Sequence, residues 1–361
     1  MAVARGWLTC LALFGLVSAF AGDEEFAAVV PSRPINFPQD FGAHPEFRTE
    51  WWYVTGWITD PAGTERGFQV TFFRVGTGLA GDNPSRFAPQ QLVLAHGAIA
   101  DPARGRLLHA ERSARADGRL AGADSGATRA WIREWRLAGD GSHYVAHVED
   151  DEFSLDLTLE ATQPPMLNGF GGYSRKGPDP AGASYYYSQP QLTVAGQVRL
   201  GDRKFPVRGR AWLDHEWSSA YLPPGARGWD WIGINFDGGG ALMAFRMRDS
   251  AGRAVWAGAT LREADGRQRI FGPAEIRFRP GRPWTSPRTG STYPVTWTVE
   301  VGHGPDLRRF DLQPMMDDQE LDSRTSTGTI YWEGAVRCLE QGSERGKGYL
   351  ELTGYDSDLA L

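Results

Sequence analysis

The chain has 361 residues, a formal net charge of −6 and 12% aromatic residues. This acidic balance argues against nucleic acid or an anionic membrane surface as a partner. The 45 glycines, 23 prolines and 14 tryptophans, set around short β-branched and aromatic runs, are typical of antiparallel sheets closed into barrels or sandwiches. One hydrophobic core rarely organises a chain of this length, so two domains are expected.

Residues 1–21 have the pattern of a secretory signal peptide. Arg5 precedes an apolar run at 7–20, which ends in small residues and is followed by an acidic segment. The run is shorter than the roughly 20 residues of a transmembrane helix, and no later run is long and apolar enough to span a bilayer. We expect cleavage near Ala21 and export to the periplasm or the cell exterior, with residues 22–49 as an extended lead-in. The mature chain then keeps a single cysteine and cannot form an intramolecular disulfide.

A first series of short strands follows the lead-in. In 67–75 the side chains of Phe68, Val70 and Phe72 share one face, because side chains alternate along a strand. A glycine-rich and proline-rich stretch at 163–182 predicts a long loop, and such loops are often functional. These strands predict an N-terminal barrel over 50–205, with strands at 51–58, 67–75, 91–100, 107–111, 131–137, 143–149, 153–160, 183–188 and 192–200.

A second series predicts a C-terminal barrel over 206–361. Its clearest hairpin has a turn at Asp237-Gly238-Gly239-Gly240 between two apolar runs. The expected fold class is therefore all-β, with two antiparallel barrels and the change of domain near 195–215. The strands of this half are expected at 205–213, 229–236, 241–248, 254–261, 270–278, 292–301, 307–312, 331–338 and 348–355.

The densest group of chemically active side chains is Asp214-His215-Glu216-Trp217. In a strand, His215 and Trp217 point one way, while Asp214 and Glu216 point the other. An imidazole beside an indole in an apolar barrel could transfer a proton to a substrate, and the indole face could stabilise a cation. The alternative is that His215 is a hydrogen-bonded core histidine and the carboxylates are structural.

Two further aromatic clusters are candidates for ligand binding. The first is Glu50-Trp51-Trp52-Tyr53, in which a buried Glu50 needs a partner such as Arg48 or Arg74. The second, Tyr331-Trp332-Glu333-Gly334, has a similar composition in the other half of the chain. The alternative for both clusters is that their aromatic residues only pack in a core. In the second cluster the acid would then face outward.

Other catalytic patterns are missing from the sequence. It has no Gly-x-Ser-x-Gly elbow, no nucleotide-binding glycine fingerprint and no His-Glu-x-x-His motif. His143 and His147 would lie about 13 Å apart on a strand, too far to share a zinc ion. Cys338 is expected in the core. We therefore predict neither a metal nor another cofactor.

Several aromatic motifs occur in one order along the mature chain: Phe37-Pro38, Arg48-Thr49-Glu50-Trp51-Trp52-Tyr53, Leu167-Asn168-Gly169, Ala183-Ser184-Tyr185-Tyr186-Tyr187-Ser188, Trp212-Leu213-Asp214-His215-Glu216-Trp217-Ser218-Ser219, Gly228-Trp229-Asp230-Trp231, Tyr331-Trp332-Glu333-Gly334 and Gly348-Tyr349-Leu350-Glu351-Leu352. Together they resemble the AttH-like, lipocalin-like secreted proteins that are grouped with carotenoid 1,2-hydratase. The resemblance implies two lipocalin-like, calycin-type β-barrels in one chain.

The resemblance also implies a site. The Asp-His-x-Trp segment of the hydratases matches Asp214, His215 and Trp217, which are the predicted catalytic residues. The predicted ligand-binding residues are Glu50, Trp51, Trp52, Tyr53, Trp229, Trp231, Tyr331 and Trp332. Two functions remain open: a secreted protein that binds an apolar, isoprenoid or lipid-like ligand in a barrel cavity, and a cofactor-free hydratase or lyase that protonates an alkene and adds water.

Overall fold

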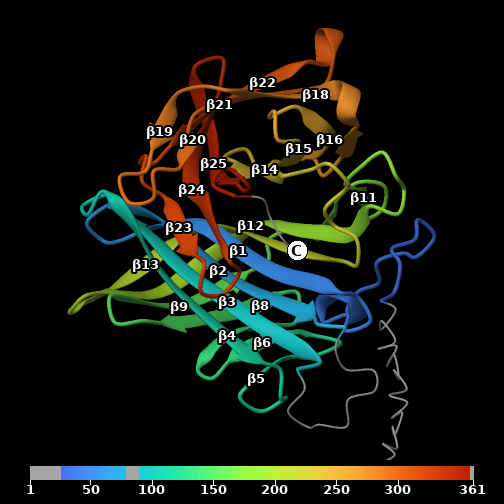
Figure 1. Cartoon of the computed structure of the whole chain (residues 1–361). Helices are drawn as coiled ribbons and strands as arrows, with labels where there is room; N and C mark the ends of the chain where they lie inside the picture. Colours follow the sequence, from blue (N-terminus) through green and yellow to red (C-terminus); the bar gives the residue numbers. More distant parts are fainter. Residues whose placement is uncertain (1–25, 79–88, 358–361) are drawn as a thin grey trace, which may run out of the picture.

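The computed structural model describes residues 26–78 and 89–357, so the predicted signal peptide lies outside the described residues (Figure 1). In the described ranges the structure is all-β, as predicted. Its helical turns there are three short 3-10 helices: η1 (Gln39–Phe41), η2 (Pro273–Glu275) and η3 (Gly304–Asp306). Within the same ranges, no helix has the length and apolar character needed to cross a membrane.

The first sheet curls into a nearly closed antiparallel barrel. Its strands follow the order β4-β3-β2-β1-β13-β12-β9-β8-β7-β6-β5, and β10 and β11 pair with β12. The bounds are β1 (Thr49–Thr59), β2 (Glu65–Gly76), β3 (Gln91–Asp101), β4 (Arg106–Arg115), β5 (Ala121–Ala123), β6 (Thr128–Ile132), β7 (Trp135–Gly139), β8 (His143–Glu149), β9 (Phe153–Glu160), β10 (Met166–Leu167), β11 (Tyr173–Arg175), β12 (Ala183–Leu200) and β13 (Arg203–Ser218).

The second sheet is also antiparallel and lies above the first in Figure 1. Its order is β17-β16-β15-β14-β25-β24-β22-β21-β18, with β23 paired to β24 and a separate small β19-β20 ribbon. The bounds are β14 (Gly228–Phe236), β15 (Ala241–Arg248), β16 (Ala254–Arg262), β17 (Gln268–Phe271), β18 (Ile276–Pro280), β19 (Pro283–Thr285), β20 (Thr292–Pro294), β21 (Trp297–Val301), β22 (Arg308–Pro314), β23 (Glu320–Ser323), β24 (Thr329–Glu340) and β25 (Ser343–Leu352).

Three of the predicted strands are divided in the structure. The predicted strand at 292–301 becomes β20, which pairs with β19, and β21, which pairs with β18. The predicted strand at 131–137 becomes β6 and β7, because Arg133 takes a left-handed conformation with φ of 57° in the hairpin turn between them. The predicted strand at 270–278 becomes β17 and β18, because Pro273 has no amide to donate and begins η2 instead.

The chain passes to the second sheet later than the sequence suggested. Strand β13 pairs with both β1 and β12, so it belongs to the first sheet along its whole length. The predicted division between residues 205 and 206 falls within this strand. The passage lies between Ser218 and Gly228, and the Asp214–Trp217 segment is therefore part of the first barrel.

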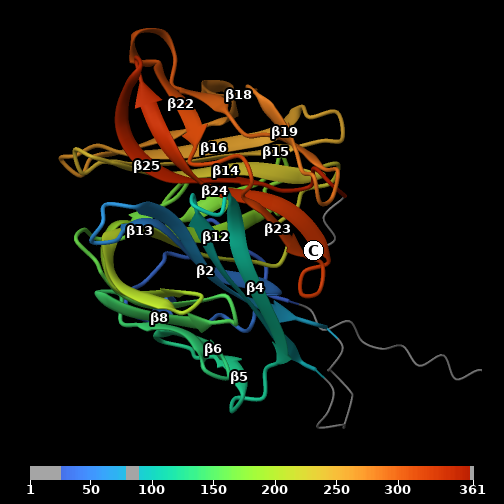
Figure 2. The ribbon, with the colours of Figure 1, turned by 90° about the vertical axis from the view of Figure 1, so that its left-hand side faces the viewer.

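The two sheets lie one above the other (Figure 2). An aromatic and methionine-rich layer of side chains packs between them. Tyr53, Trp57 and Trp212 of the first sheet meet Trp231 and Phe245 of the second. This layer is separate from the apolar cluster inside each sheet. The outer face of the first barrel is consequently buried wherever the second sheet covers it.

Candidate functional site between the two sheets

A cavity of about 310 Å³ lies between the two sheets. The first sheet contributes side chains from β1, β2, β3, β12 and β13, and the second contributes side chains from β14, β24, β25 and the turn before β24. Its size is at the lower end of the roughly 300–1,000 Å³ typical of small-molecule sites. Both halves of the chain are therefore needed to form it.

Two carboxyls of the second sheet line this cavity side by side. Glu333 on β24 is directly opposite Glu351 on β25 in the strand register, and Glu333 is 1% exposed. Gln69 Nε2 donates to Glu333 Oε2 at 2.8 Å, and Trp229 Nε1 donates to Glu351 Oε1 at 3.1 Å. Burial raises the pKa of both carboxyls, and the charge of Glu351 raises that of Glu333 further. A pair of this kind holds a proton at neutral pH.

Two more carboxyls enter the cavity from β13. Burial raises the pKa of Asp214 to about 7, although Tyr186, Ser188 and Trp212 all donate hydrogen bonds to it. Burial also raises the pKa of Glu216, opposed by an ion pair of 2.6 Å with Lys176 Nζ. Besides Glu50, which is paired with Arg74, four acids thus line the cavity, and a single described ion pair neutralises one of these four.

The remaining lining combines eight aromatic residues with threonine and aliphatic side chains, and it includes a few unsatisfied polar atoms. Trp51, Phe73, Tyr221 and Trp229 offer ring surface to a ligand. Glu333 Oε1 and the hydroxyl of its neighbour Tyr53 are buried, yet they make no hydrogen bond of good geometry. Such orphaned groups are unfavourable unless a ligand or water completes them. The lining is thus suited to a ligand with an unsaturated body and at least one polar group.

The predicted site residues divide between this cavity and the two sheet interiors. The cavity gathers Asp214 with Trp51, Tyr53, Trp229, Trp231 and Tyr331, and Glu50 touches its edge. His215, Trp217 and Trp52 lie inside the first barrel, fully buried. Trp332 packs in the core of the second sheet. The alternation expected for 213–217 is present, but it separates Asp214 from His215.

Inside the first barrel, His215 belongs to a hydrogen-bonded network centred on Glu50. His215 Nε2 and His44 Nδ1 lie 2.8 and 2.7 Å from Glu50 Oε1, and Arg74 Nε donates to Glu50 Oε2 at 2.8 Å. Burial lowers the pKa of His215 to about 4. Against the effect of burial, hydrogen bonds from His215 and His44 hold the pKa of Glu50 well below its usual range. The neutral His215 and the ionised Glu50 are therefore both held by hydrogen bonds within the barrel, which indicates a structural role for them.

The same network contains ligand atoms of the kind that bind metals. One atom each of His44, Glu50 and His215 lies within 4.8 Å of the others. However, both imidazoles already hydrogen-bond to Glu50, and the Arg74 cation contacts the same carboxylate. His44 Nε2 is also bound to Asp40 Oδ1 at 2.9 Å, and its ring stacks on Trp217 at 3.8 Å. These contacts fit a hydrogen-bonded clamp on the lead-in segment better than a metal site.

The pair formed by Glu333 and Glu351 was not predicted from the sequence. Glu333 belonged to a candidate ligand-binding cluster, whose alternative was a packed strand with one outward-facing acid, but it was not itself a predicted site residue. Glu351 was noted only as part of a motif. The signal for Glu333 was its position two residues after Tyr331, on the same face of one strand. Nothing in the sequence shows that the face is covered by the other sheet, which is what makes the pair unusual.

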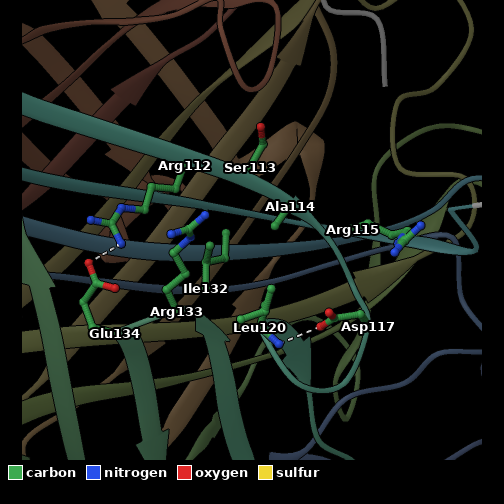
Figure 3. A pocket seen from close by; sticks show the side chains of 9 residues that line it. All are labelled: Arg112, Ser113, Ala114, Arg115, Asp117, Leu120, Ile132, Arg133 and Glu134. Atoms are coloured by element: carbon green, nitrogen blue, oxygen red, sulfur yellow. Dashed lines mark hydrogen bonds and ion pairs between the residues drawn. The ribbon is translucent and has the colours of Figure 1, made fainter. Parts of the chain in front are cut away.

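A larger hollow of about 650 Å³ lies where the first barrel fails to close, between β4 and the β5–β6 segment (Figure 3). Its charged groups are largely satisfied locally. Arg112 is paired with Glu134 at 2.7 Å, and Asp117 accepts the amide of Leu120 at 2.6 Å. None of the predicted site residues lines this hollow.

Comparison with solved structures identifies similar folds. A protein from Nitrosomonas europaea, solved as a candidate AttH, is 47% identical, with a TM-score of 0.85, and the match covers 91% of this chain and 100% of that one. Kievitone hydratase from Nectria haematococca shares the fold at 15% identity and a TM-score of 0.67, covering 93% and 97% of the two chains. CghA is 16% identical with a TM-score of 0.52, covering 93% and 98%.

The comparison with curated proteins gives no match. The AttH-like family model matches residues 28–355, which include both sheets and every residue of the cavity. The chain therefore belongs to the AttH-like family.

Proposed function

We propose that the protein binds a small unsaturated compound between its two sheets and adds water to it, or removes water from it, by acid–base catalysis without a cofactor. The observation that carries the proposal is the Glu333–Glu351 pair, which burial keeps protonated inside an aromatic cavity. Acids with raised pKa values in a cleft are frequent at catalytic sites. The hydratase among the solved structures of this fold is consistent with the proposal but supports only the fold.

The first chemical step is proton transfer from the pair to an alkene carbon. The alkene π electrons form the new C–H bond, which leaves a cation on the adjacent carbon and a carboxylate on the protein. An acid with a raised pKa is protonated at neutral pH but is a weak donor. The substrate alkene must therefore be electron-rich, through conjugation or an attached oxygen.

The cavity walls are suited to the second step. The faces of Trp51 and Trp229 can stabilise a developing cation. Water then forms the C–O bond, and the proton that it loses returns to the carboxylate pair. Another acid of the lining, Asp214, can orient this water because its pKa of about 7 leaves both protonation states accessible. The cycle is balanced and regenerates the acid.

Simple carriage of an apolar ligand is the alternative function. A carrier needs a dry cavity, and four buried carboxyls make this one unfavourable for a purely apolar guest. We therefore place ligand binding within a catalytic function. The binding site that we propose is the cavity between the sheets, in place of the barrel interior that the sequence suggested.

The test is incubation of the purified protein with a set of hydroxystyrenes, enol ethers and prenylated phenols in isotopically labelled water, followed by mass spectrometry. We expect a product heavier by one labelled water. Glu333→Gln should lower the rate about a hundredfold with little change in substrate affinity, because the amide keeps the shape but cannot donate the proton.

The matched control is Glu152→Gln, since Glu152 is half exposed at the surface. It should leave the rate unchanged. If the wild-type protein and Glu333→Gln both retain a ligand and return it unaltered, the protein is a carrier. If Glu333→Gln and the wild-type protein convert substrate equally fast, the pair is not the acid.

A further inference from the structure

The cavity is connected to a second group of buried side chains that crosses from one half of the chain to the other. His96 on β3 is completely buried and lies between Tyr331 of β24 and Ser326 of the turn before β24. His96 Nδ1 is 2.9 Å from the Tyr331 hydroxyl, and His96 Nε2 is 2.8 Å from Ser326 Oγ. Tyr331 and Ser326 both line the cavity.

The chain of contacts continues to a carboxylate at the surface. Ser326 donates both its hydroxyl and its amide, the latter at 3.2 Å, to Glu111 Oε2 on β4. The Glu111 side chain is 14% exposed and does not line the cavity. Figure 2 shows β4 beside β23, the strand that leads into this turn. The groups therefore form one path from the surface to the cavity, through residues of both sheets.

The cavity end of this path lies beside the proposed acid. Tyr331 and Glu333 are two residues apart on the same face of β24, and both line the cavity. We propose that Glu111, Ser326, His96 and Tyr331 form a proton relay that exchanges protons between the solvent and the buried Glu333–Glu351 pair. The inference rests on the proposed function, whose hydration cycle itself returns a proton to the pair, and it names the groups that restore this proton whenever the pair has lost it to the solvent.

The proton transfers of the relay balance. Glu111 takes a proton from a hydronium ion of the solvent, and once it is protonated the Ser326 hydroxyl turns from Glu111 to His96. Glu111 then passes its proton to Ser326 Oγ, whose own proton moves to His96 Nε2. His96 then releases the proton on Nδ1 to the Tyr331 oxygen, and the Tyr331 hydroxyl proton moves to the Glu333 carboxylate. Each relay group finishes with as many protons as it had, and the imidazole changes tautomer. Burial lowers the pKa of His96 to about 3, which keeps it in the neutral form that can both accept and donate.

The alternative interpretation of this geometry is that Ser326 is a catalytic nucleophile. A serine hydrolase needs free amide donors near the nucleophile to stabilise an oxyanion. Here the Ser326 amide is bonded to Glu111, and the amides of Thr327 and Gly328 are bonded to the Ser323 carbonyl. The Ser326 hydroxyl also points to a carboxylate. The turn is therefore arranged for proton transfer and lacks the donors of an acyl-transfer site.

The relay can be tested without a substrate. After a rapid pH jump, infrared absorption of the protonated carboxyl reports how fast the buried pair takes up or loses a proton, and Glu333→Gln identifies the band. We expect Ser326→Ala and His96→Leu to slow this exchange about tenfold or more, with the same final amplitude. Ser326→Thr keeps a hydroxyl and should keep the rate, and Glu152→Gln serves as the surface control.

Wild-type exchange rates in both Ser326→Ala and His96→Leu would overturn the relay, because protons would then reach the pair by another route. Covalent labelling of Ser326 by a fluorophosphonate would also overturn it, in favour of a nucleophile. The measurement follows protons in the free protein. A failure to find hydration would therefore leave the relay supported, and a failed relay would leave the acid pair testable through turnover.

Discussion

The most heavily bonded single residue of the first barrel is Glu50. It is fully buried and accepts hydrogen bonds from His44 and Arg74 and from the His215 ring. We predict that Glu50→Gln lowers the free energy of unfolding by about 3 kcal/mol, because the amide leaves the buried Arg74 charge without its carboxylate. Urea unfolding at neutral pH measures this change, and the exposed-site variant Glu152→Gln should lie within about 0.5 kcal/mol of wild type.

The position of His215 changes what its substitution should do. The sequence suggested that it acts on a substrate, yet its ring lies in the barrel interior between Trp52 and Glu50. In the proposed mechanism, loss of the ring acts through stability and not through the acid step. Equal stability of Glu50→Gln and wild type would show that the network contributes little and would reopen a catalytic role for His215.

The candidate site shows how far residue patterns can predict function. Alternation along 213–217 correctly separates Asp214 from His215, because a strand fixes which side chains share a face. The pattern cannot say which face meets a cavity, since that depends on a second sheet whose strands extend from Gly228 to Leu352. For this reason the sequence pointed to His215 and gave no reason to place Glu333 beside Glu351.

At the scale of elements, the pairing of β24 with β25 makes stability depend on pH. Glu333 and Glu351 bind protons more tightly in the folded state, since burial raises the pKa of each. Their contribution to the stability of the folded protein is complete below the ordinary carboxyl pKa of 4.5. It is lost as the pH rises through the raised pKa values of the folded state. We predict that the free energy of unfolding falls above pH 5, by up to about 1.4 kcal/mol per pH unit for each group.

The comparison that isolates this effect is wild type against Glu351→Gln in urea unfolding between about pH 5 and pH 8. The variant should have the smaller slope, because the amide does not titrate. The Glu50 network contributes equally to both proteins and cancels in the difference. Identical slopes in the two proteins would mean that the pair is not held protonated by the fold.

Element boundaries show a similar division between what local sequence can and cannot predict. The strands at 143–149 and 153–160 are found at the predicted residues, because apolar residues alternate between clear turns. The strand predicted at 131–137 failed because a left-handed Arg133 carries no glycine signal. The end of β13 was placed too early, since only its partners β1 and β12 define it.

At the scale of the molecule, the cavity and the relay both depend on how closely the two sheets approach. The indole of Trp57 on β1 donates to the Gly348 carbonyl on β25 at 3.0 Å, and Gln191 and Asn235 join β12 to β14. Buried contacts of this kind make each sheet part of the environment of the other. The sequence predicted two barrels but could not predict this packing, which depends on side chains far apart in the chain.

The close approach of Gly67 on β2 to the second sheet allows a test of the packing between the sheets. A Cβ atom at Gly67 on β2 would lie 2.6 Å from both Ala335 Cβ and the Tyr349 hydroxyl of the second sheet. We predict that Gly67→Ala destabilises the protein by about 1–3 kcal/mol, because the sheets must separate to admit the methyl group. Gly238 is the matched control, since a Cβ there meets nothing within 4 Å, and Gly238→Ala should change stability by less than about 0.5 kcal/mol.

Calorimetry of both variants measures the difference, and the heat absorbed should remain in one transition if the sheets unfold together. Two resolved transitions in the wild-type protein would show that the halves are independent, and the site between them would then open without unfolding.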